Sequence, residues 1–229
     1  MNDAPRAKPA VWFPDTSALI TLAVHEPLHA AVRAVLSRQR RVLVTAIVDE
    51  LDSLSRARGS LADWARTALG QLDWLGRPVE VDVPVGTRLA ASFQERLAGE
   101  RPLRHCLEHY GEAAIVALAC RARKFAPRLL SDDYGARALA KVNGIEPVSV
   151  HRLLFSMISA GHLVDAEAAD FAAVLHKTGR AADYTIEELR SGRLGRSVNP
   201  DRQRGKSRSL PVVRRLSRSS CALAASASG

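Results

Sequence analysis

The chain has 229 residues, 47% of them hydrophobic, which is enough to bury the core of one domain with appendages. No apolar run reaches the roughly 20 residues of a membrane-spanning helix, and residues 1–10 lack the apolar segment of a secretory signal. The three cysteines, Cys106, Cys120 and Cys221, form no CxxC pair, which argues against a disulfide framework and a zinc ribbon. We therefore expect a cytoplasmic protein that does not enter a membrane.

Most of the excess positive charge lies at the C-terminal end. Residues 195–229 contain eight arginines and lysines against a single acid, Asp201, so this segment carries +7 of the net charge of +9. It is rich in serine and arginine and has neither a helical nor a strand period, which predicts a disordered basic tail. Such a tail either binds nucleic acid or only increases solubility, and composition does not separate the two.

The remainder of the chain alternates short apolar segments with segments of helical period. The strand-like segments are VWF, RVLVTA, PVEVDV, PRLLS and IEPVSV, and the helical period is found at 28–38, 46–58, 61–75, 87–98, 111–125 and 134–142. An amphipathic helix is also expected from Asp165. This alternation predicts an α/β fold with three layers, α/β/α, around a central and mostly parallel sheet. There is no GxGxxG or GxxxxGK[ST] loop, so a nucleotide site is unsupported.

The first strand-like segment ends in an acid. In VWFPDTSALITLA, residues 11–23, Asp15 follows bulky apolar residues and a proline, and an apolar pattern of helical period comes next. An aspartate at such a junction is a favourable helix N-cap. It also stands where open parallel sheets bind their ligands, outside the carboxyl ends of the strands. Both interpretations stay open on this segment alone.

Two predicted helices carry a glutamate on the apolar side. In TAIVDELDSLSRARG, for which Thr45 is the expected N-cap, Glu50 lies at the edge of the apolar stripe. In GEAAIVALACRARKF, Glu112 lies along the stripe in the first turn, where the helix dipole also favours an acid. Because carboxylates on the core side of a helix are usually paired or coordinate a cation, these two glutamates are candidate ligands.

A later strand, in PRLLSDDYGARALA, ends in the pair Asp132 and Asp133, one of which is expected to cap the helix from Tyr134. Parallel strands would bring these acids to the same edge of the sheet as Asp15. Several carboxylates gathered there would repel one another unless a divalent cation lay among them. Oxygen ligands suit Mg²⁺ or Mn²⁺, and such clusters favour phosphodiester hydrolysis.

Four segments, taken in order, resemble the motifs of the PIN-domain ribonucleases: PDTSALI, VTAIVDELDSL, GEAAIVALA and LLSDDYGARALAKVNGIEPVSV. The resemblance runs from about Val11 to about Leu154. Carried over residue by residue, it implies that the metal-binding and catalytic acids are Asp15, Glu50, Glu112 and Asp133, with Asp132 as the alternative ligand at the last position. Thr16 and Ser17 match hydroxyl residues that steady the site. Glu112 stands where many members of the family have aspartate.

The resemblance implies cleavage of single-stranded or looped RNA with Mg²⁺ or Mn²⁺ as cofactor, leaving a 5′-phosphate. Bacterial members are often toxins of the VapC type, which are held inactive by an antitoxin protein and are commonly dimers. We therefore expect RNA as substrate and an antitoxin and a second copy of the chain as candidate partners. The expected organisation is a flexible N-terminus (1–10), a PIN-like domain (11–154), a helical extension (155–194) and the basic tail (195–229).

Three alternatives remain beside an active nuclease. An inert PIN-like module could bind nucleic acid through its tail, but phosphate binding alone gives no use for a carboxylate cluster. A phosphatase of the haloacid-dehalogenase kind would have DxD after the first strand, where this chain has DTS, and a response-regulator domain would have its acidic pair early in the chain.

The segment HCLEHYGE, with His105, Cys106 and His109, has the residue types of a soft-metal site but lacks HExxH.

Overall fold

The sheet at the centre of the protein has four parallel strands. The computed structural model describes residues 8–180 except 82–84, 101, 104–107 and 123. Within these residues the sheet has the order β2-β1-β3-β4 and consists of β1 (Ala10–Pro14), β2 (Arg40–Arg41), β3 (Ala126–Leu130) and β4 (Glu146–Val148). Every neighbouring pair is parallel. The predicted α/β class with a parallel sheet is therefore confirmed.

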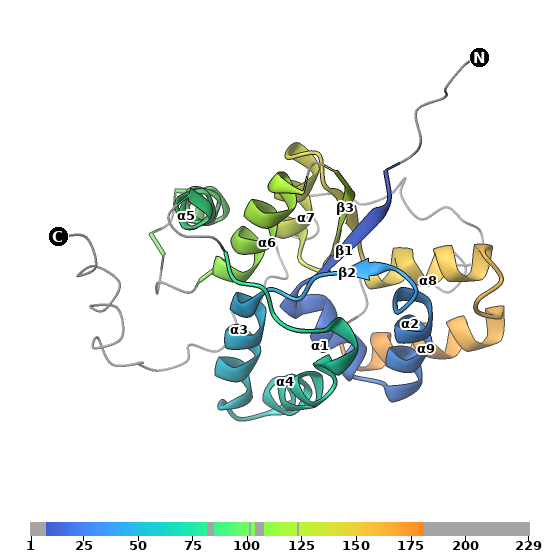
Figure 1. Ribbon diagram of the computed structural model, residues 1–229. Coiled ribbons are helices and arrows are strands. Elements are labelled where there is room, and N and C mark those ends of the chain that lie inside the picture. Colours follow the sequence, from blue (N-terminus) through green and yellow to red (C-terminus); the bar gives the residue numbers. More distant parts are fainter. Residues whose placement is uncertain (1–7, 82–84, 101, 104–107, 123, 181–229) are drawn as a thin grey trace, which may run out of the picture. The chain divides into compact units, whose positions relative to one another are not determined.

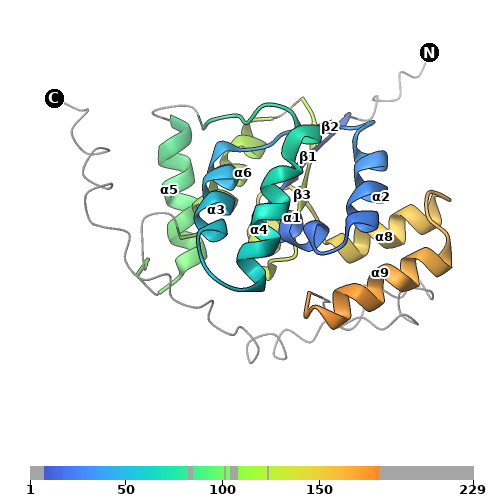
Figure 2. The same cartoon turned by 90° about the horizontal axis from the view of Figure 1, so that it is seen from below.

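Helices cover both faces of the sheet, as the predicted three layers require. Figures 1 and 2 show α6 and α7 on one side and α1, α2 and α8 on the other, with α5 packed outside α6. The helices are α1 (Thr16–Ala23), α2 (Glu26–Leu36), α3 (Thr45–Ser55), α4 (Ser60–Gly70), α5 (Val85–Ala98), α6 (Tyr110–Arg121), α7 (Tyr134–Val142), α8 (Val150–Ser159) and α9 (Asp165–Lys177), with the short 3₁₀ helix η1 (Leu72–Leu75) after α4. None of these helices is long and apolar enough to cross a membrane.

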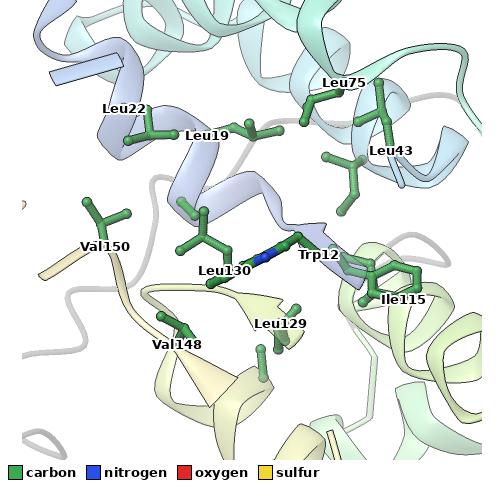
Figure 3. Close-up of a cluster of buried hydrophobic side chains, with 14 of the residues drawn as sticks. Trp12, Leu19, Leu22, Leu43, Leu75, Ile115, Leu129, Leu130, Val148 and Val150 are labelled. Carbon is green, nitrogen blue, oxygen red and sulfur yellow. The ribbon is translucent and has the colours of Figure 1, made fainter. Parts of the chain in front are cut away.

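The core forms where the helices meet the two central strands. Residues 11–14 of β1 are all buried, because helices cover both of its faces, and β3 pairs with β1 along its whole length. Figure 3 shows Trp12 of β1 with Leu129 and Leu130 of β3 among leucines from α1 and Ile115 from α6. The run of apolar residues that predicts β1 thus reflects burial on both faces of the strand.

Two predicted strands are shorter than their sequence patterns suggest. RVLVTA contributes only its first residue to β2, because the chain leaves the sheet after Arg41 and enters α3 at Thr45. PVEVDV forms no strand in its described part and makes a single parallel bridge between Val79 and Val44. Thr45 was expected to be the N-cap of α3, but this is wrong, because Val44 holds that position and makes no side-chain cap bond.

The C-terminal helices belong to the same packed body. Helix α8 was not predicted, and it runs across the expected domain boundary at Leu154, whose side chain is fully buried. The predicted amphipathic helix from Asp165 is present as α9, with Phe171 and Leu175 buried. Residues 181–194 of the extension and the predicted basic tail lie outside the described residues.

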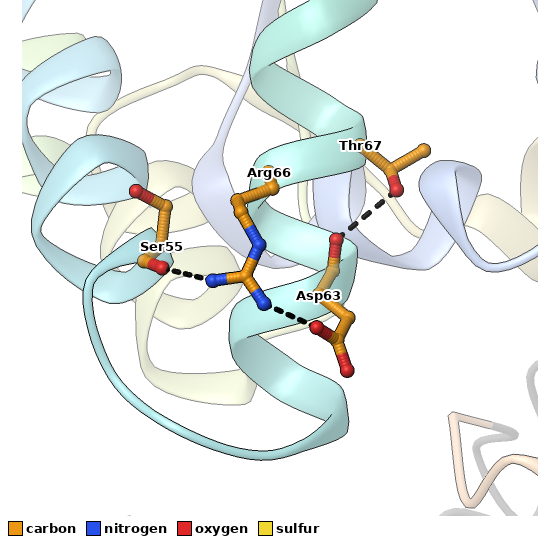
Figure 4. A network of polar contacts seen from close by, with 4 residues as sticks. All are labelled: Ser55, Asp63, Arg66 and Thr67. Atoms are coloured by element: carbon orange, nitrogen blue, oxygen red, sulfur yellow. Dashed lines mark hydrogen bonds and ion pairs between the residues drawn. The ribbon is translucent and has the colours of Figure 1, made fainter.

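A polar network fixes the turn between α3 and α4. Arg66 donates to the backbone oxygen of Ser55 at the end of α3 and to the carboxylate of Asp63 in its own helix, and Thr67 donates to the backbone oxygen of Asp63 over 3.0 Å (Figure 4). These bonds hold together the ends of two helices that both contact α1. Helix α3, which carries Glu50, is therefore held at its C-terminal end by α4.

Candidate functional site

The strand order places a ligand site between β1 and β3. After β1 the chain passes through α1 and α2 to β2 on one side, and after β3 it passes through α7 to β4 on the other. Open α/β sheets bind their ligands outside the carboxyl ends of the strands at such a point of divergence. Asp15 follows β1 directly, and Asp132 and Asp133 follow β3.

Asp15 is buried at this point and fully engaged. Its side chain is 1% exposed, and its Oδ1 accepts hydrogen bonds from the backbone N–H of Ala18 (2.8 Å) and the hydroxyl of Ser17 (2.9 Å). The first bond makes Asp15 the N-cap of α1, so the capping interpretation is confirmed. Its backbone N–H donates to Leu130 (3.0 Å), which continues the pairing of β1 and β3 up to the acid.

The two glutamates reach the same place from α3 and α6. Thr16, the first residue of α1, donates its hydroxyl to Oε2 of Glu50 over 2.7 Å. The same Glu50 oxygen lies against Gly111 in the first turn of α6, next to Glu112. The first turn of α6 thus brings the carboxyl group of Glu112 near that of Glu50. One oxygen of Glu112, Oε2, is buried and has no hydrogen-bond partner within the described residues.

Burial and mutual repulsion raise the pKa of these three acids. Burial is the main cause in each case, and it brings the pKa of Asp15 to about 8, that of Glu50 to about 7 and that of Glu112 to about 8. The charge of Glu112 raises the pKa of Asp15 further, and Asp15 does the same to Glu50, while hydroxyl groups of serine and threonine act in the opposite direction. Without a cation, the site therefore holds protons at neutral pH.

The two aspartates after β3 face different surroundings. The charge of Asp133 raises the pKa of both Glu50 and Glu112, so it belongs to the same electrostatic cluster. Its Oδ1 also accepts from the backbone N–H of Ala136 (2.7 Å), which makes it the N-cap of α7, as predicted for one member of the pair. Asp132 instead accepts from the N–H of Val150 at the start of α8 (3.0 Å). The structure brings together Asp15, Glu50, Glu112 and Asp133 and places Asp132 at the side of the cluster.

Ser17 ties the two strand ends to each other. Its Oγ donates to Asp15 and accepts from the backbone N–H groups of Asp132 (2.8 Å) and Asp133 (3.1 Å). The second N–H also donates to the hydroxyl of Ser131, a fully buried residue at the end of β3 (3.1 Å). The resemblance indicated a supporting role for Ser17 but not this bridge, and Ser131 was missed because nothing in the sequence relates it to Asp15.

Gly111 is a second residue that the sequence analysis missed. A Cβ atom at this position would lie 2.7 Å from Oε2 of Glu50 and 2.8 Å from Cδ1 of Ile47, both on α3. Helices α3 and α6 can approach this closely only because Gly111 has no side chain. The signal in the sequence is a glycine directly before Glu112 in a helix that otherwise favours alanine.

The donor set fits a hard divalent cation in its chemistry. All four groups are carboxylates, one buried oxygen of Glu112 has no partner within the described residues, and the charges of neighbouring acids raise the pKa of Glu50 and of Glu112. As the side chains stand, no three acids, histidines or cysteines among the described residues form a group that could hold a metal ion. Mg²⁺ usually takes only one or two carboxylates directly and keeps several waters, so this cluster suits it if some of the acids act through water.

Neither the segment with His105 and His109 nor His25 and His29, which are also four residues apart, gives support to a soft-metal site. His25 packs its ring against Phe171 with 5.6 Å between ring centroids, and His29 packs against Trp74 at 6.0 Å. His105 and Cys106 lie outside the described residues, and His109 precedes α6 in a left-handed conformation. The rings of His25 and His29 thus pack against aromatic side chains, as histidines in a protein core do.

Comparisons of the chain with protein-family models, with curated proteins and with solved structures gave no match. The assignment of the site therefore depends on its residues and their geometry.

Removing the Ser17 hydroxyl should weaken the junction of the two strands. Ser17→Ala leaves the N–H of Asp132 without its acceptor and takes one from Asp133, so the free energy of unfolding should fall by about 1–3 kcal/mol. The matched control is Ser156→Ala, because among the described residues that exposed hydroxyl bonds only to the backbone oxygen of Arg152 in its own helix. Urea unfolding of both variants tests this, and equal stabilities would contradict the bridging role.

Adding a methyl group at Gly111 should be costly, although alanine favours helices. Gly111→Ala must displace Glu50 or Ile47, and such overpacking costs about 1–3 kcal/mol. Gly70→Ala is the control, since no atom lies within 4 Å of its Cβ position at the end of α4, and it should be neutral or stabilising by up to about 1 kcal/mol. A Gly111→Ala protein as stable in urea as the Gly70→Ala protein would show that α3 and α6 are not closely fitted there.

The raised pKa values predict how stability depends on pH in metal-free buffer. In the unfolded chain these acids ionise near about pH 4, whereas Asp15, Glu50 and Glu112 stay protonated in the folded chain up to pKa values of about 8, 7 and 8. The folded state thus binds more protons between these limits, so the free energy of unfolding should fall as the pH rises from about 4 to about 8.

Asp15→Asn isolates one part of this effect. The variant cannot ionise at this position, so relative to the wild type it should gain stability as the pH is raised from 5 to 8 in the presence of a chelator. Asp49→Asn, an exposed site on α3, is the control and should follow the wild type. Urea midpoints at both pH values measure the difference, and an unchanged pH slope in Asp15→Asn would refute the burial of a charge there.

Proposed function

We propose that the protein is a ribonuclease that hydrolyses RNA phosphodiester bonds with Mg²⁺ or Mn²⁺ at the cluster of Asp15, Glu50, Glu112 and Asp133. One observation supports this above all: a buried aspartate, Asp15, and two half-buried glutamates, Glu50 and Glu112, gather at the carboxyl ends of the central strands, and the pKa of each is raised. Such a group of acids is stable only while it is protonated or with a cation among its members, and a divalent ion gives this arrangement a use. The resemblance of the four motifs to PIN-domain ribonucleases supports the choice of RNA as substrate.

The roles of the side chains follow from their contacts. Ser17 and the N-terminus of α1 orient Asp15, and Thr16 fixes one oxygen of Glu50. Glu112 presents an oxygen without a partner in the described chain. A bound divalent ion would position a water molecule and neutralise charge at the attacked phosphate. The acids release their protons when the cation binds, so its affinity should increase with pH.

The inert nucleic-acid-binding module is the weaker proposal. It would leave the buried carboxylates without a use, and no contact of the described residues favours it. The toxin assignment, with an antitoxin and a second copy of the chain as partners, is a finer proposal that depends on the resemblance alone. A small neighbouring gene for a DNA-binding antitoxin would support it.

The decisive test is cleavage of mixed RNAs with Mg²⁺, with Mn²⁺ or with a chelator. Wild-type protein should cleave only with metal, and Asp15→Asn should lose activity by on the order of 10²–10³-fold, because a metal contributes several kcal/mol of transition-state stabilisation. Asp49→Asn removes an exposed acid from α3 and should keep full activity. Metal-dependent cleavage that survives in Asp15→Asn would refute the mechanism.

The two aspartates after β3 should differ in the same assay. Asp133→Asn should reduce cleavage much more than Asp132→Asn, because the charge of Asp133 acts on both glutamates while Asp132 is bonded to α8. Melting temperatures of both variants control for loss of fold, since each side chain also accepts a backbone N–H. The reverse ranking would make Asp132 the ligand.

A further inference from the structure

Arg180 follows the last described helix in a position fixed by the backbone. Gly179 adopts a left-handed conformation with φ of +70°, and its N–H donates to His176 (3.0 Å). The N–H of Arg180 donates to Leu175 (2.8 Å), which completes a Schellman motif at the end of α9. Because Leu175 and Phe171 are buried, the helix that carries this cap is itself anchored in the core.

The side chain of Arg180 turns back towards the acid cluster. Its guanidinium carbon lies 5.8 Å from the ring centroid of Trp64 on α4, a cation–π distance. Burial lowers the pKa of Arg180, and the charges of Asp132 and Asp15 raise it, so this cation is within electrostatic reach of both strand ends. A residue from the C-terminal extension thus adds a positive charge near Asp132 and Asp15.

Two donors of this guanidinium are unused. Nε and Nη2 are buried and have no hydrogen-bond partner among the described residues. Oδ2 of Asp132 is likewise buried and unpartnered there, so the arginine and the nearby acid are not bonded to each other through these atoms. Nε and Nη2 form one edge of the planar fork, which matches two oxygens of a phosphate. Buried donors cost about 1–3 kcal/mol if they stay unpaired, so a ligand group is expected to meet them.

We propose that Arg180 binds a phosphate group of the RNA substrate through its Nε–Nη2 edge, so that the C-terminal extension completes the substrate site beside the acid cluster. This inference rests on the proposed function. Arg180 supplies a positive charge and a bidentate contact where carboxylates alone would repel RNA, and Trp64 holds the plane of its guanidinium. Lysine at this position would keep the charge but lose the fork.

Cleavage kinetics of the full chain test the role in substrate binding. Arg180→Ala should raise KM for single-stranded RNA by on the order of ten- to a hundredfold, the value of one charge-assisted hydrogen-bonding contact. Arg180→Lys should recover part of this loss, and affinity for Mn²⁺ should stay within about twofold of the wild type in both variants. Arg38→Ala is the matched control, because Arg38 is exposed beyond α2, before β2 and away from the carboxyl ends of the strands.

Binding without cleavage separates this inference from the proposed function. In an Asp15→Asn background with Mg²⁺, fluorescence anisotropy with a labelled single-stranded RNA should show weaker binding when Arg180→Ala is added. The slope of log K against log salt should become shallower by about 0.7, the value for one lost phosphate contact, and Arg38→Ala should not change it. A wild type that cleaves no RNA, with this difference in binding intact, would refute the nuclease and keep the phosphate contact.

Two results would overturn the role of Arg180. The first is an Arg180→Ala protein with unchanged KM and RNA affinity but a lower melting temperature, together with the same fall in melting temperature in Asp132→Asn. Arg180 would then be a structural contact between the end of α9 and the end of β3. Tighter Mn²⁺ binding and faster cleavage at limiting metal in Arg180→Ala would make it an internal counter-charge that competes with the cation. The Arg180→Lys protein decides the question by its KM and salt slope if Arg180→Ala does not fold.

Discussion

The burial of several carboxyl groups at the end of one pair of strands is the constraint on which the rest of this structure depends. Asp15 has almost no exposure, and its pKa and those of Glu50 and Glu112 are raised by burial and by one another. Such a cluster is stable only as protonated groups, or with a cation among them. The helix caps, the close contact at Gly111 and the serine bridge are arrangements that hold the acids together despite this cost.

The capping role and the candidate catalytic role of the aspartates are compatible. Asp15 and Asp133 each give one oxygen to the backbone N–H of the helix that follows, α1 or α7. In both cases the positive end of the helix lies beside the acid, and at Asp15 the bond from Ala18 lowers the pKa that burial raises. The same bond fixes the orientation of the carboxyl group. An aspartate that caps a helix at the end of a central strand is therefore also held in one orientation, as a metal-binding side chain needs to be.

The C-terminal helices affect the site directly. The N-terminus of α8 bonds Asp132 and so separates it from the acid cluster, and the cap of α9 delivers Arg180 next to Trp64. Neither helix is a detached appendage, because Leu154 of α8 and Leu175 of α9 are fully buried. The C-terminal helices thus hold one oxygen of Asp132 and place a cation within electrostatic reach of Asp15 and Asp132.

The sequence by itself determined the fold class, most helices, and the four acids as candidates, because these depend on apolar period and on residues beside predicted strand ends. It overestimated RVLVTA and PVEVDV as strands, because apolar residues that pack between helices give the same local pattern. Only the tertiary structure shows that Asp133 acts on both glutamates, that Ser17 bonds both strand ends, that Gly111 lies against Glu50 and that Arg180 lies within electrostatic reach of Asp15. The hydrogen bonds from Thr16 to Glu50 and from Asp133 to Ser17 join residues 34 and 116 positions apart, and such contacts depend on strand order and helix packing, which no local period records.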